Sequence, residues 1–507
     1  MDTKNNGSKG EEISIYPRDR FFWFGEINKA STVMLREQDI ISEELCAEIA
    51  KAVEQVIIDG EKPGAKRTFD YFELEQELIA YGGPEITKVH VGRSRVDMVD
   101  VTIPRLEQRD AILDSFEQFI LMRKALLEFV KSNPNAIVPF YTQGVPAQPT
   151  TLGHYLGGYL EAFSRIADRY LELWERLNKS PFGVAAGGTS SFHLDRERLS
   201  ELLGFDGVIC NSFDAAHAAP LDIGIEVSNV VSTVASTVSM FMTDILLQYT
   251  YSKPWIIMDE GVYKQGADSV LKEGELTGTS SMMPQKRNPK ALTRVRMLAS
   301  TVKGSSVTFL MQSHNIIHGL VDYKLEIIDS YPYMPLNAVK LSTEMLELLK
   351  KAIGIFVFDE ERALKEVTSD YTMITELAVE LQKEYDVPFR ISHHFASEIV
   401  TYGKEHQLVP LEIPYSIAQK LYSDTAKTFK FQIEDLPLSE QDFYSILKPE
   451  TMVRNAAVLG GPQPSEVERM LGIEEEKILT DLGWLENKRS KLKEAEHKLR
   501  TEFENYL

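Results

Sequence analysis

A little past its middle, the chain reads Gly278-Thr279-Ser280-Ser281-Met282-Met283-Pro284-Gln285-Lys286-Arg287-Asn288-Pro289. This stretch combines small and hydroxylated residues with a Lys, an Asn and two prolines. Backbone N–H groups, hydroxyls, an ammonium and an amide together suit a small anion that is rich in oxygen. Because a helical pattern follows from about Lys290 to Met311, the stretch is typical of an anion-binding loop at a helix N-terminus. On composition alone, an ordinary loop between prolines is the alternative.

Three long stretches show the three- and four-residue spacing of apolar residues that marks one face of an α-helix. One runs from Ile225 to Tyr249, one from Tyr159 to Leu177, and the third follows the loop. Such stripes predict a helical bundle that cannot cover all its apolar surface within one chain, so we expect oligomerisation. The tail from Glu474 to Leu507 is dense in Glu and Lys and predicts a solvated terminal helix, with Glu486 and Arg489 in reach across one turn.

Composition narrows the class of protein. The chain has 507 residues, which predicts two to four domains at ~100–200 residues each. With 55 Lys and Arg against 76 Asp and Glu, the net charge is −21, which argues against nucleic acid and anionic membranes as partners. Two cysteines, Cys46 and Cys210, favour a reducing, cytoplasmic location over a disulfide framework. We find no signal peptide, no membrane-spanning run, no cluster with metal-ligand spacing and no nucleotide-binding loop, so we expect neither metal nor cofactor.

Four further motifs, taken with the loop, resemble those of the fumarase/aspartase superfamily and most closely its argininosuccinate lyase branch. They are residues 26–42, His90-Val91-Gly92-Arg93-Ser94-Arg95-Val96-Asp97, Ala147-Gln148-Pro149-Thr150-Thr151-Leu152-Gly153-His154, and Val458-Leu459-Gly460-Gly461-Pro462. The resemblance covers most of the chain. It implies an all-α fold with an N-terminal domain (1–105), a long central helical bundle (106–367) and a C-terminal helical domain (368–507). It also implies a homotetramer whose active sites draw residues from different subunits.

The resemblance implies a lyase that eliminates fumarate from a substituted succinate. That reaction needs a base to remove a proton beside a carboxylate, and donors to stabilise the resulting dianion. The matching positions make Ser280 the base, activated when the loop closes and excludes water. The implied substrate-binding residues are Arg93, Ser94, Arg95, Thr142, Gln143, Ser281, Met283, Lys286 and Asn288. For each of these, a surface or loop-capping role is the alternative.

The departures from the family pattern concern the leaving group. Gln143 stands where the family usually has a His, and Thr293 where a Glu pairs with that His. Val96, Met98, Lys290, Leu320 and Leu325 replace an Asn, a Gln, an Asp, and the Tyr and Gln that hold arginine in argininosuccinate lyases. The fumarate side of the site is therefore kept and the leaving-group side is rebuilt.

We predict a fumarate-forming lyase for an S- or N-substituted succinate whose leaving group is not arginine. A thiol of pKa ~8.5 departs as an anion more easily than an amine of pKa ~10.4, which makes S-(2-succino)cysteine, cleaved at a C–S bond, a candidate substrate. The alternatives are argininosuccinate or another N-substituted aspartate cleaved at a C–N bond, adenylosuccinate-type activity, and an inactive structural homologue.

Overall fold

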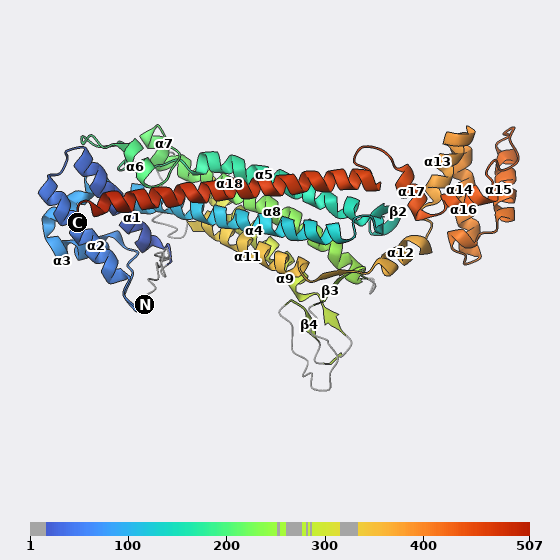
Figure 1. The fold of residues 1–507 in the computed structure, drawn as a ribbon, viewed down its shortest axis with the longest axis horizontal. Coiled ribbons are helices and arrows are strands. Elements are labelled where there is room, and N and C mark those ends of the chain that lie inside the picture. Colours follow the sequence, from blue (N-terminus) through green and yellow to red (C-terminus); the bar gives the residue numbers. More distant parts are fainter. Residues whose placement is uncertain (1–16, 251–253, 260–275, 280–281, 284–285, 315–332) are drawn as a thin grey trace, which may run out of the picture.

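The computed structural model describes residues 17–250, 254–259, 276–279, 282–283, 286–314 and 333–507. The molecule is elongated and built almost entirely of helices, which confirms the predicted all-α class (Figure 1). Its long helices form a central bundle with smaller groups of helices at both ends (Figure 1). Ser280, Ser281, Leu320 and Leu325, which the sequence singles out, lie outside the described residues.

The N-terminal end contains α1 (Arg20–Glu37), α2 (Glu43–Gly60) and α3 (Tyr71–Gly82), followed by the 3-10 helix η1 (Pro84–His90) and the π-helix η2 (Val96–Thr102). The side chains of Asp19, Ser42 and Asp70 accept backbone N–H bonds at the starts of α1, α2 and α3, so each helix begins at an N-cap residue. Buried apolar residues of these helices form a separate hydrophobic cluster. This cluster supports the segment that leads to Arg93.

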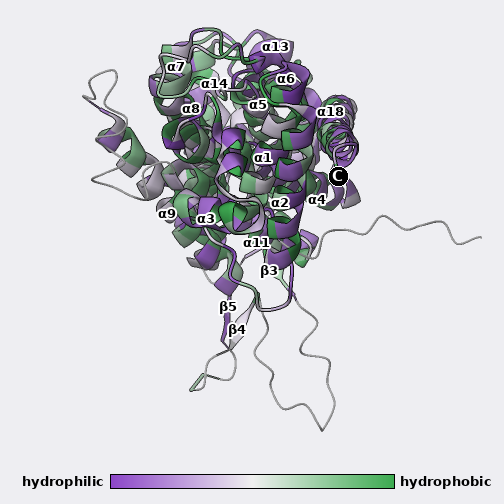
Figure 2. Cartoon of the chain, turned by 90° about the vertical axis from the view of Figure 1, so that its left-hand side faces the viewer, coloured by the Kyte–Doolittle hydropathy of each residue, from purple (hydrophilic) through white to green (hydrophobic). Residues whose placement is uncertain are grey.

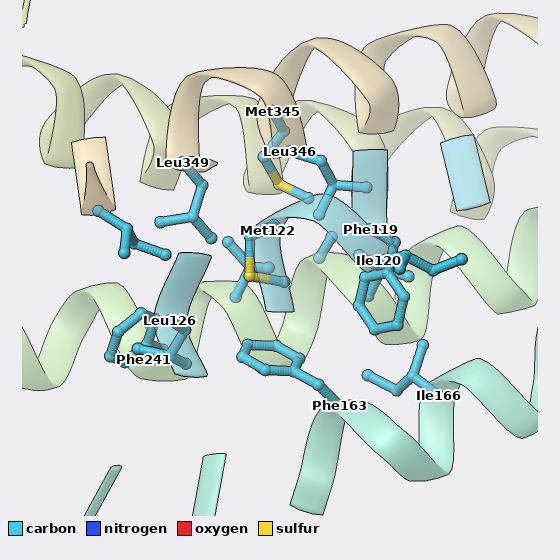
Figure 3. Packing of buried hydrophobic residues seen from close by; sticks show 14 of the residues in the cluster. Phe119, Ile120, Met122, Leu126, Phe163, Ile166, Phe241, Met345, Leu346 and Leu349 are labelled. Carbon is cyan, nitrogen blue, oxygen red and sulfur yellow. The ribbon is translucent and has the colours of Figure 1, made fainter. Parts of the chain in front are cut away.

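The central bundle consists of α4 (Ile103–Ser132), α5 (Leu152–Leu177), α8 (Ala219–Thr250), α9 (Lys290–Ser313) and α11 (Met334–Ile353). The short helices α6 (Arg196–Leu202) and α7 (Ser212–His217) lie between α5 and α8 in the sequence. The three helices predicted from apolar spacing correspond to α5, α8 and α9 and are confirmed. Figure 3 shows how Met122 of α4, Phe163 of α5, Phe241 of α8 and Leu349 of α11 converge in the core.

The described residues include three short antiparallel strand pairs beside the helices. β1 (Ile137–Thr142) pairs with β2 (Val145–Thr151), β3 (Ile256–Met258) with β6 (Phe356–Phe358), and β4 (Gly278–Thr279) with β5 (Arg287–Asn288). In the view along the bundle, β4 and β5 project below the helices (Figure 2). The two strands that flank the loop singled out in the sequence therefore stand away from the bundle, and β5 leads directly into α9.

The C-terminal end holds α12 (Glu360–Ser369), α13 (Ile374–Tyr385), α14 (Phe389–Glu405), η4 (Pro410–Glu412), α15 (Tyr415–Thr428), α16 (Glu440–Ile446) and α17 (Pro449–Asn455). The last helix, α18 (Pro464–Glu504), then runs back along the bundle to the N-terminal helices (Figure 1). Its residues Val467, Leu471 and Ile478 are buried in the central core, so the predicted terminal helix is solvated on one face only. The domain limits at 105 and 367 stay a prediction.

Arg489 on α18 shows how the tail is held. Its guanidinium donates to Asp114 Oδ1 at 2.9 Å and to Glu117 Oε2 at 3.1 Å, both on α4. The sequence suggested Glu486 as its partner within the same helix. Bonds between two helices, rather than along one, therefore hold this part of α18 on the bundle.

Among the described residues, α8 is long and apolar enough to meet a composition test for a membrane-spanning helix. Within its most apolar window, 44% of the residues are buried inside the molecule, and core helices of water-soluble proteins meet the same test. The prediction that the chain has no membrane partner therefore stays a prediction.

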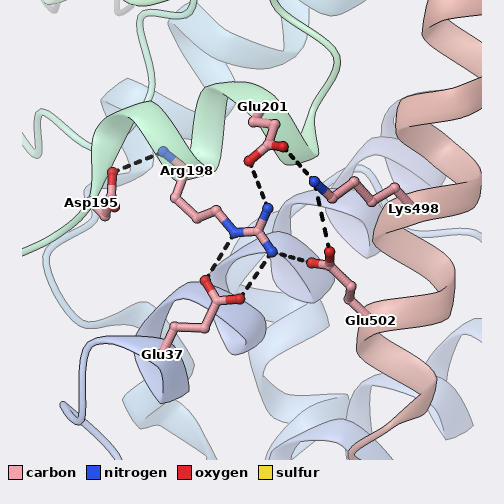
Figure 4. Close-up of polar contacts among 6 residues, drawn as sticks. All are labelled: Glu37, Asp195, Arg198, Glu201, Lys498 and Glu502. Carbon is pink, nitrogen blue, oxygen red and sulfur yellow. Dashed lines mark hydrogen bonds and ion pairs between the residues drawn. The ribbon is translucent and has the colours of Figure 1, made fainter.

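An ion-pair cluster centred on Arg198 joins three parts of the chain (Figure 4). Arg198, on α6, donates to both oxygens of Glu37 of α1 at 2.9 Å, and to Glu502 of α18. It also pairs with Glu201 at 2.6 Å, and Lys498 bonds to Glu201 in turn. The Arg198 side chain is 16% exposed, so solvent screens this cluster less than a typical surface pair.

The packing of His90 at the end of η1 affects its titration. Its ring stacks on Tyr71 with 4.9 Å between ring centroids. Burial lowers the pKa of His90 to about 4, and the nearby positive charge of Arg93 acts in the same direction. Folding therefore favours the neutral ring.

We predict that Arg198→Met lowers the free energy of unfolding by ~1.5–3 kcal/mol, because it leaves three carboxylates together without their shared cation. Urea unfolding at one fixed protein concentration measures the change. Arg500→Met is the matched control, because Arg500 is 75% exposed and its ion pair with Glu504 lies within one helix. Equal effects of the two substitutions would mean that the cluster contributes nothing.

We also predict a pH effect that His90→Phe abolishes. In the unfolded chain a His titrates near pKa ~6.5, so between about pH 6.5 and 4 the unfolded state binds a proton that the folded state does not. The stability contributed by neutral His90 is fully present above that window and is lost as the pH falls through it. Between pH 7 and pH 5, wild type should lose ~2 kcal/mol more unfolding free energy than His90→Phe. Parallel pH profiles of the two proteins would contradict this.

Candidate active site

The predicted site residues lie in three separate parts of one chain. Arg93, Ser94 and Arg95 follow the N-terminal helices at one end of the molecule. Thr142 and Gln143 lie in the hairpin of β1 and β2, near the opposite end of the bundle, and the β4–β5 ribbon stands between these two places (Figure 1). A single chain therefore does not bring the three parts together.

Arg93 is buried and anchored to the first helix. Its Nη1 donates to Asn28 Oδ1 and to Ser31 Oγ, both at 3.0 Å. Burial lowers the pKa of Arg93, while Tyr71 and Asp97 act to raise it. Both anchoring partners come from residues 26–42, so the first two motifs form one structural unit.

Ser94 is held by a buried carboxylate that the sequence analysis did not single out. The Ser94 backbone N–H donates to Asp97 Oδ1 at 2.8 Å, and Asp97 Oδ2 accepts from the N–H groups of Val184 and Ala185 at 3.2 and 3.1 Å. Burial raises the pKa of Asp97 to about 7, and these donors together with Arg93 act to lower it. Asp97 thus ties the segment carrying Ser94 to the chain before α6, while the Arg95 side chain is exposed.

The structure adds a π-helix to this motif. η2 begins directly after Arg95. π-helical turns inside helices are rare overall, but those that occur often lie at functional sites. No residue pattern in the sequence predicts this π-helix. The Ser-x-x-Asp spacing of Ser94 and Asp97 is the signal that could have identified the carboxylate, because it is typical of a side chain capping a helix start.

Thr142 and Gln143 lie exposed at the tip of a tight hairpin. Thr142 pairs with Val145, which leaves Gln143 and Gly144 as the two turn residues. Their φ angles are 53° and 79°, as a type I′ turn requires. A positive φ is uncommon for Gln, so the hairpin holds Gln143 in a conformation that residues other than Gly rarely adopt.

The β4–β5 ribbon brings Met283, Lys286 and Asn288 together. Asn288 pairs with Gly278 across the ribbon and is half-buried, and the Lys286 backbone N–H donates to Met283 O at 3.1 Å. The Lys286 and Met283 side chains are exposed. Ser280 and Ser281, between the strands, lie outside the described residues, so their predicted roles are untested.

α9 begins at Lys290, as predicted, immediately after the ribbon. Lys290 and Thr293 are exposed on its first turn, and Thr293 Oγ1 donates to Pro289 O at 3.4 Å. Met98, at another departure from the family pattern, is fully buried in the N-terminal cluster. Its side chain therefore packs in the core.

No group of three or more His, Cys, Asp and Glu side chains with metal-binding geometry occurs within the described ranges. What the described parts offer is a set of hydrogen-bond donors suited to carboxylates: a buried guanidinium, the ammonium of Lys286 and the amide of Asn288.

Family models match two regions of the chain. A model described as "Lyase" matches residues 38–304, and one described as "Argininosuccinate lyase C-terminal" matches residues 371–454. The first covers the Arg93 segment, the hairpin and the β4–β5 ribbon. All three parts of the candidate site therefore fall inside one family match.

Individual proteins agree with these models. Argininosuccinate lyase of Methanococcus maripaludis (strain DSM 14266) is 30% identical over 477 residues, which is 93% of this chain and 92% of that protein. The crystal structure of EDDS lyase in complex with formate is 27% identical, with a TM-score of 0.83, and the match covers 96% of this chain and 92% of that one. A variant of EDDS lyase with bound fumarate gives the same identity and coverage and a TM-score of 0.82.

The predicted resemblance is thereby confirmed, both by the family models and by relatives matched over more than nine-tenths of the chain. The chain belongs to the fumarase/aspartase superfamily of fumarate-forming lyases, in its argininosuccinate lyase-like branch.

Proposed function

We propose that this enzyme eliminates fumarate from an S- or N-substituted succinate whose leaving group is not arginine, with Ser280 as the general base. The observation that carries the proposal is the contrast between two parts of the site. Lys286 and Asn288, which supply an ammonium and an amide, follow Ser280 closely in the sequence. The residues on the leaving-group side, Gln143 and Thr293, are neutral and exposed.

The chemistry assigns a role to each group of the ribbon. Ser280 removes the proton beside one carboxylate, and the negative charge then spreads onto that carboxylate as a dianion. Lys286 supplies a positive charge to it, while Asn288, Ser281 and the backbone at Met283 supply fixed donors. A protein with net charge −21 needs such a local cationic site to attract an anionic substrate.

The separation of the site segments and the exposed apolar surface of the bundle support an enzyme of several subunits. The Arg93 segment, the hairpin and the ribbon lie apart in one chain, so a complete site needs more than one subunit. α8 and α9 also carry large exposed apolar side chains, namely Met240, Leu247, Met297, Val307 and Met311. A second bundle would cover these, and we infer a homotetramer with shared active sites. Cys46 and Cys210 are free thiols, in agreement with a cytoplasmic location.

The kind of leaving group is inferred from the proton donor that the leaving-group side of the site lacks. A neutral Gln143 and Thr293 provide no proton donor comparable to a His–Glu pair, which favours a group that departs as an anion. A thiol has that property, and Lys290 at the first turn of α9 suits a leaving group with its own carboxylate. S-(2-succino)cysteine combines both features. An N-substituted aspartate is the second candidate, favoured by the likeness to EDDS lyase.

We predict that Ser280→Ala abolishes fumarate formation while the protein still folds and assembles. A base that acts only in the transition state lowers kcat and leaves substrate binding intact. Steady-state assays that follow fumarate by its ultraviolet absorbance test this. Ser300→Ala is the matched control, because Ser300 is an exposed residue of α9 whose hydroxyl donates to Arg296 O. Wild-type turnover by an assembled Ser280→Ala protein would remove Ser280 from the mechanism.

We predict a higher kcat/KM for S-(2-succino)cysteine than for argininosuccinate, because the site lacks both an acid pair and the residues that hold arginine. Gln143→His combined with Thr293→Glu should leave the thioether reaction no faster, since no acid limits it. The same assay should include N-substituted aspartates such as ethylenediaminedisuccinate. A kcat/KM for argininosuccinate equal to or above that for the thioether would return the enzyme to arginine chemistry, and preference for another N-substituted aspartate would establish C–N cleavage.

A further inference from the structure

Asp97 is a fully buried carboxylate that bonds to backbone N–H groups from two distant parts of the chain. Its Oδ1 accepts from Ser94 at 2.8 Å, and its Oδ2 accepts from Val184 and Ala185 at 3.2 and 3.1 Å. Burying a charge carries a desolvation cost, and an apolar residue of similar size would fill the same space without it. An apolar residue could not make these three bonds, so Asp97 fixes the backbone on both of its sides.

The turn to which Asp97 bonds has an unusual backbone. Ala185, Gly187 and Thr189 have φ angles of 52°, 108° and 60°. Such angles are uncommon for Ala and Thr and persist only where the surrounding structure holds them. Inside the turn, Val184 O accepts from the N–H groups of Gly187 and Thr189 at 2.9 and 3.0 Å. Asp97 therefore joins the Ser94 segment to a turn of defined and strained shape.

Two further contacts hold the Ser94 segment where it begins. Gly92 has a φ of 69°, and a Cβ at this position would collide with the Leu194 side chain. Leu194 lies a little further along the chain from the turn that bonds to Asp97. Arg93 is bonded to two side chains of α1. The segment is thus fixed in front of Ser94 as well as behind it.

The residues between these contacts are accessible to a ligand. Ser94 is half-buried and Arg95 is exposed, whereas Arg93 before them and Asp97 after them are buried. Ser94 Oγ accepts from the backbone N–H of Val96 at 3.2 Å, which orients the hydroxyl and leaves its proton to be donated. A hydroxyl and a guanidinium that are adjacent in sequence are donors suited to a carboxylate.

We propose that Asp97 is a positioning residue of the substrate-binding site. Its carboxylate ties the turn at residues 184–185 to the Ser94 N–H, and so holds the Ser94 hydroxyl and the Arg95 guanidinium in position to bind one carboxylate of the substrate. Asp97 itself is too deeply buried to touch the substrate, and it acts by preorganising the residues that do. The inference rests on the proposed function, because it takes Ser94 and Arg95 as donors to a succinate carboxylate.

Asp97→Asn tests the proposal, because it keeps the shape of the side chain but replaces one acceptor oxygen with an NH2 group. Either the bond to Ser94 or the bonds to the turn are then lost. We expect calorimetric titration to show fumarate binding about tenfold weaker than in wild type. KM for the preferred substrate should rise about tenfold while kcat falls by less than about threefold, because preformed donors bind substrate and transition state alike.

These measurements are made on protein that is folded by circular dichroism and has the oligomeric state of wild type. Unchanged fumarate affinity in such Asp97→Asn protein overturns the proposal.

Asp481→Asn separates positioning from stability. Asp481, on α18, is also buried, at 6% exposed, and it pairs with Arg123 in the bundle. Both substitutions should lower the melting temperature, but only Asp97→Asn should weaken fumarate binding. Equal losses of fumarate affinity in the two variants would make Asp97 a structural residue and refute the proposal.

A double-mutant cycle with Ser94→Ala tests whether Asp97 acts through its neighbour. Ser94→Ala alone should weaken fumarate binding about tenfold, since one charge-assisted bond is lost. The double variant should lie well below the roughly hundredfold loss that two independent effects would give. Losses that multiply, or the absence of a loss in Ser94→Ala, overturn the inference.

If Asp97→Asn does not fold, Asp97→Glu decides. It keeps the charge and both oxygens, but its extra methylene moves the carboxylate, so fumarate binding should weaken about threefold or more. Unchanged affinity there is refutation. Failure of wild type to bind fumarate would overturn the proposed function together with this inference, whereas wild-type binding that Asp97→Asn leaves intact overturns this inference alone.

Discussion

The rise of an α-helix, about 1.5 Å per residue, sets the distance between the parts of the candidate site. α4 has 30 residues and α8 has 32, so they are about 45 and 48 Å long, and the site segments follow or precede such helices. A helix of this length is stiff, so its two ends stay apart regardless of the conformation of the connecting loops. The separation of the N-terminal segment, the hairpin and the β4–β5 ribbon within one chain is therefore a property of the bundle.

Local patterns in the sequence were sufficient for three helices of the bundle and insufficient for the contacts between helices. Apolar spacing located α5, α8 and α9, because each buries a stripe whose period appears in the residues themselves. The Arg198 cluster escaped prediction, since its partners Glu37 and Glu502 are 161 and 304 residues away. Nothing near Arg198 in the sequence distinguishes it from a solvated charge.

The candidate site shows the same division. The family motifs pointed to Arg93, Lys286 and Asn288, but not to Asp97, which organises the backbone around Ser94, nor to the π-helix or the positive φ of Gln143. These features depend on tertiary packing and turn geometry. The residues on the leaving-group side, such as Gln143 and Thr293, could be identified in the sequence because they depart from the family pattern.

The return of α18 has a consequence for how the protein is made. Arg18 and Glu496 are 478 residues apart in sequence, and their side chains are bonded at 2.7 Å. Phe503 is buried in the N-terminal hydrophobic cluster. During synthesis the N-terminal helices emerge first, and the surface that α18 covers stays open until almost the whole chain has left the ribosome. Contacts of such long range are slow to form, so the nascent chain carries exposed apolar surface on its N-terminal helices until α18 has been made.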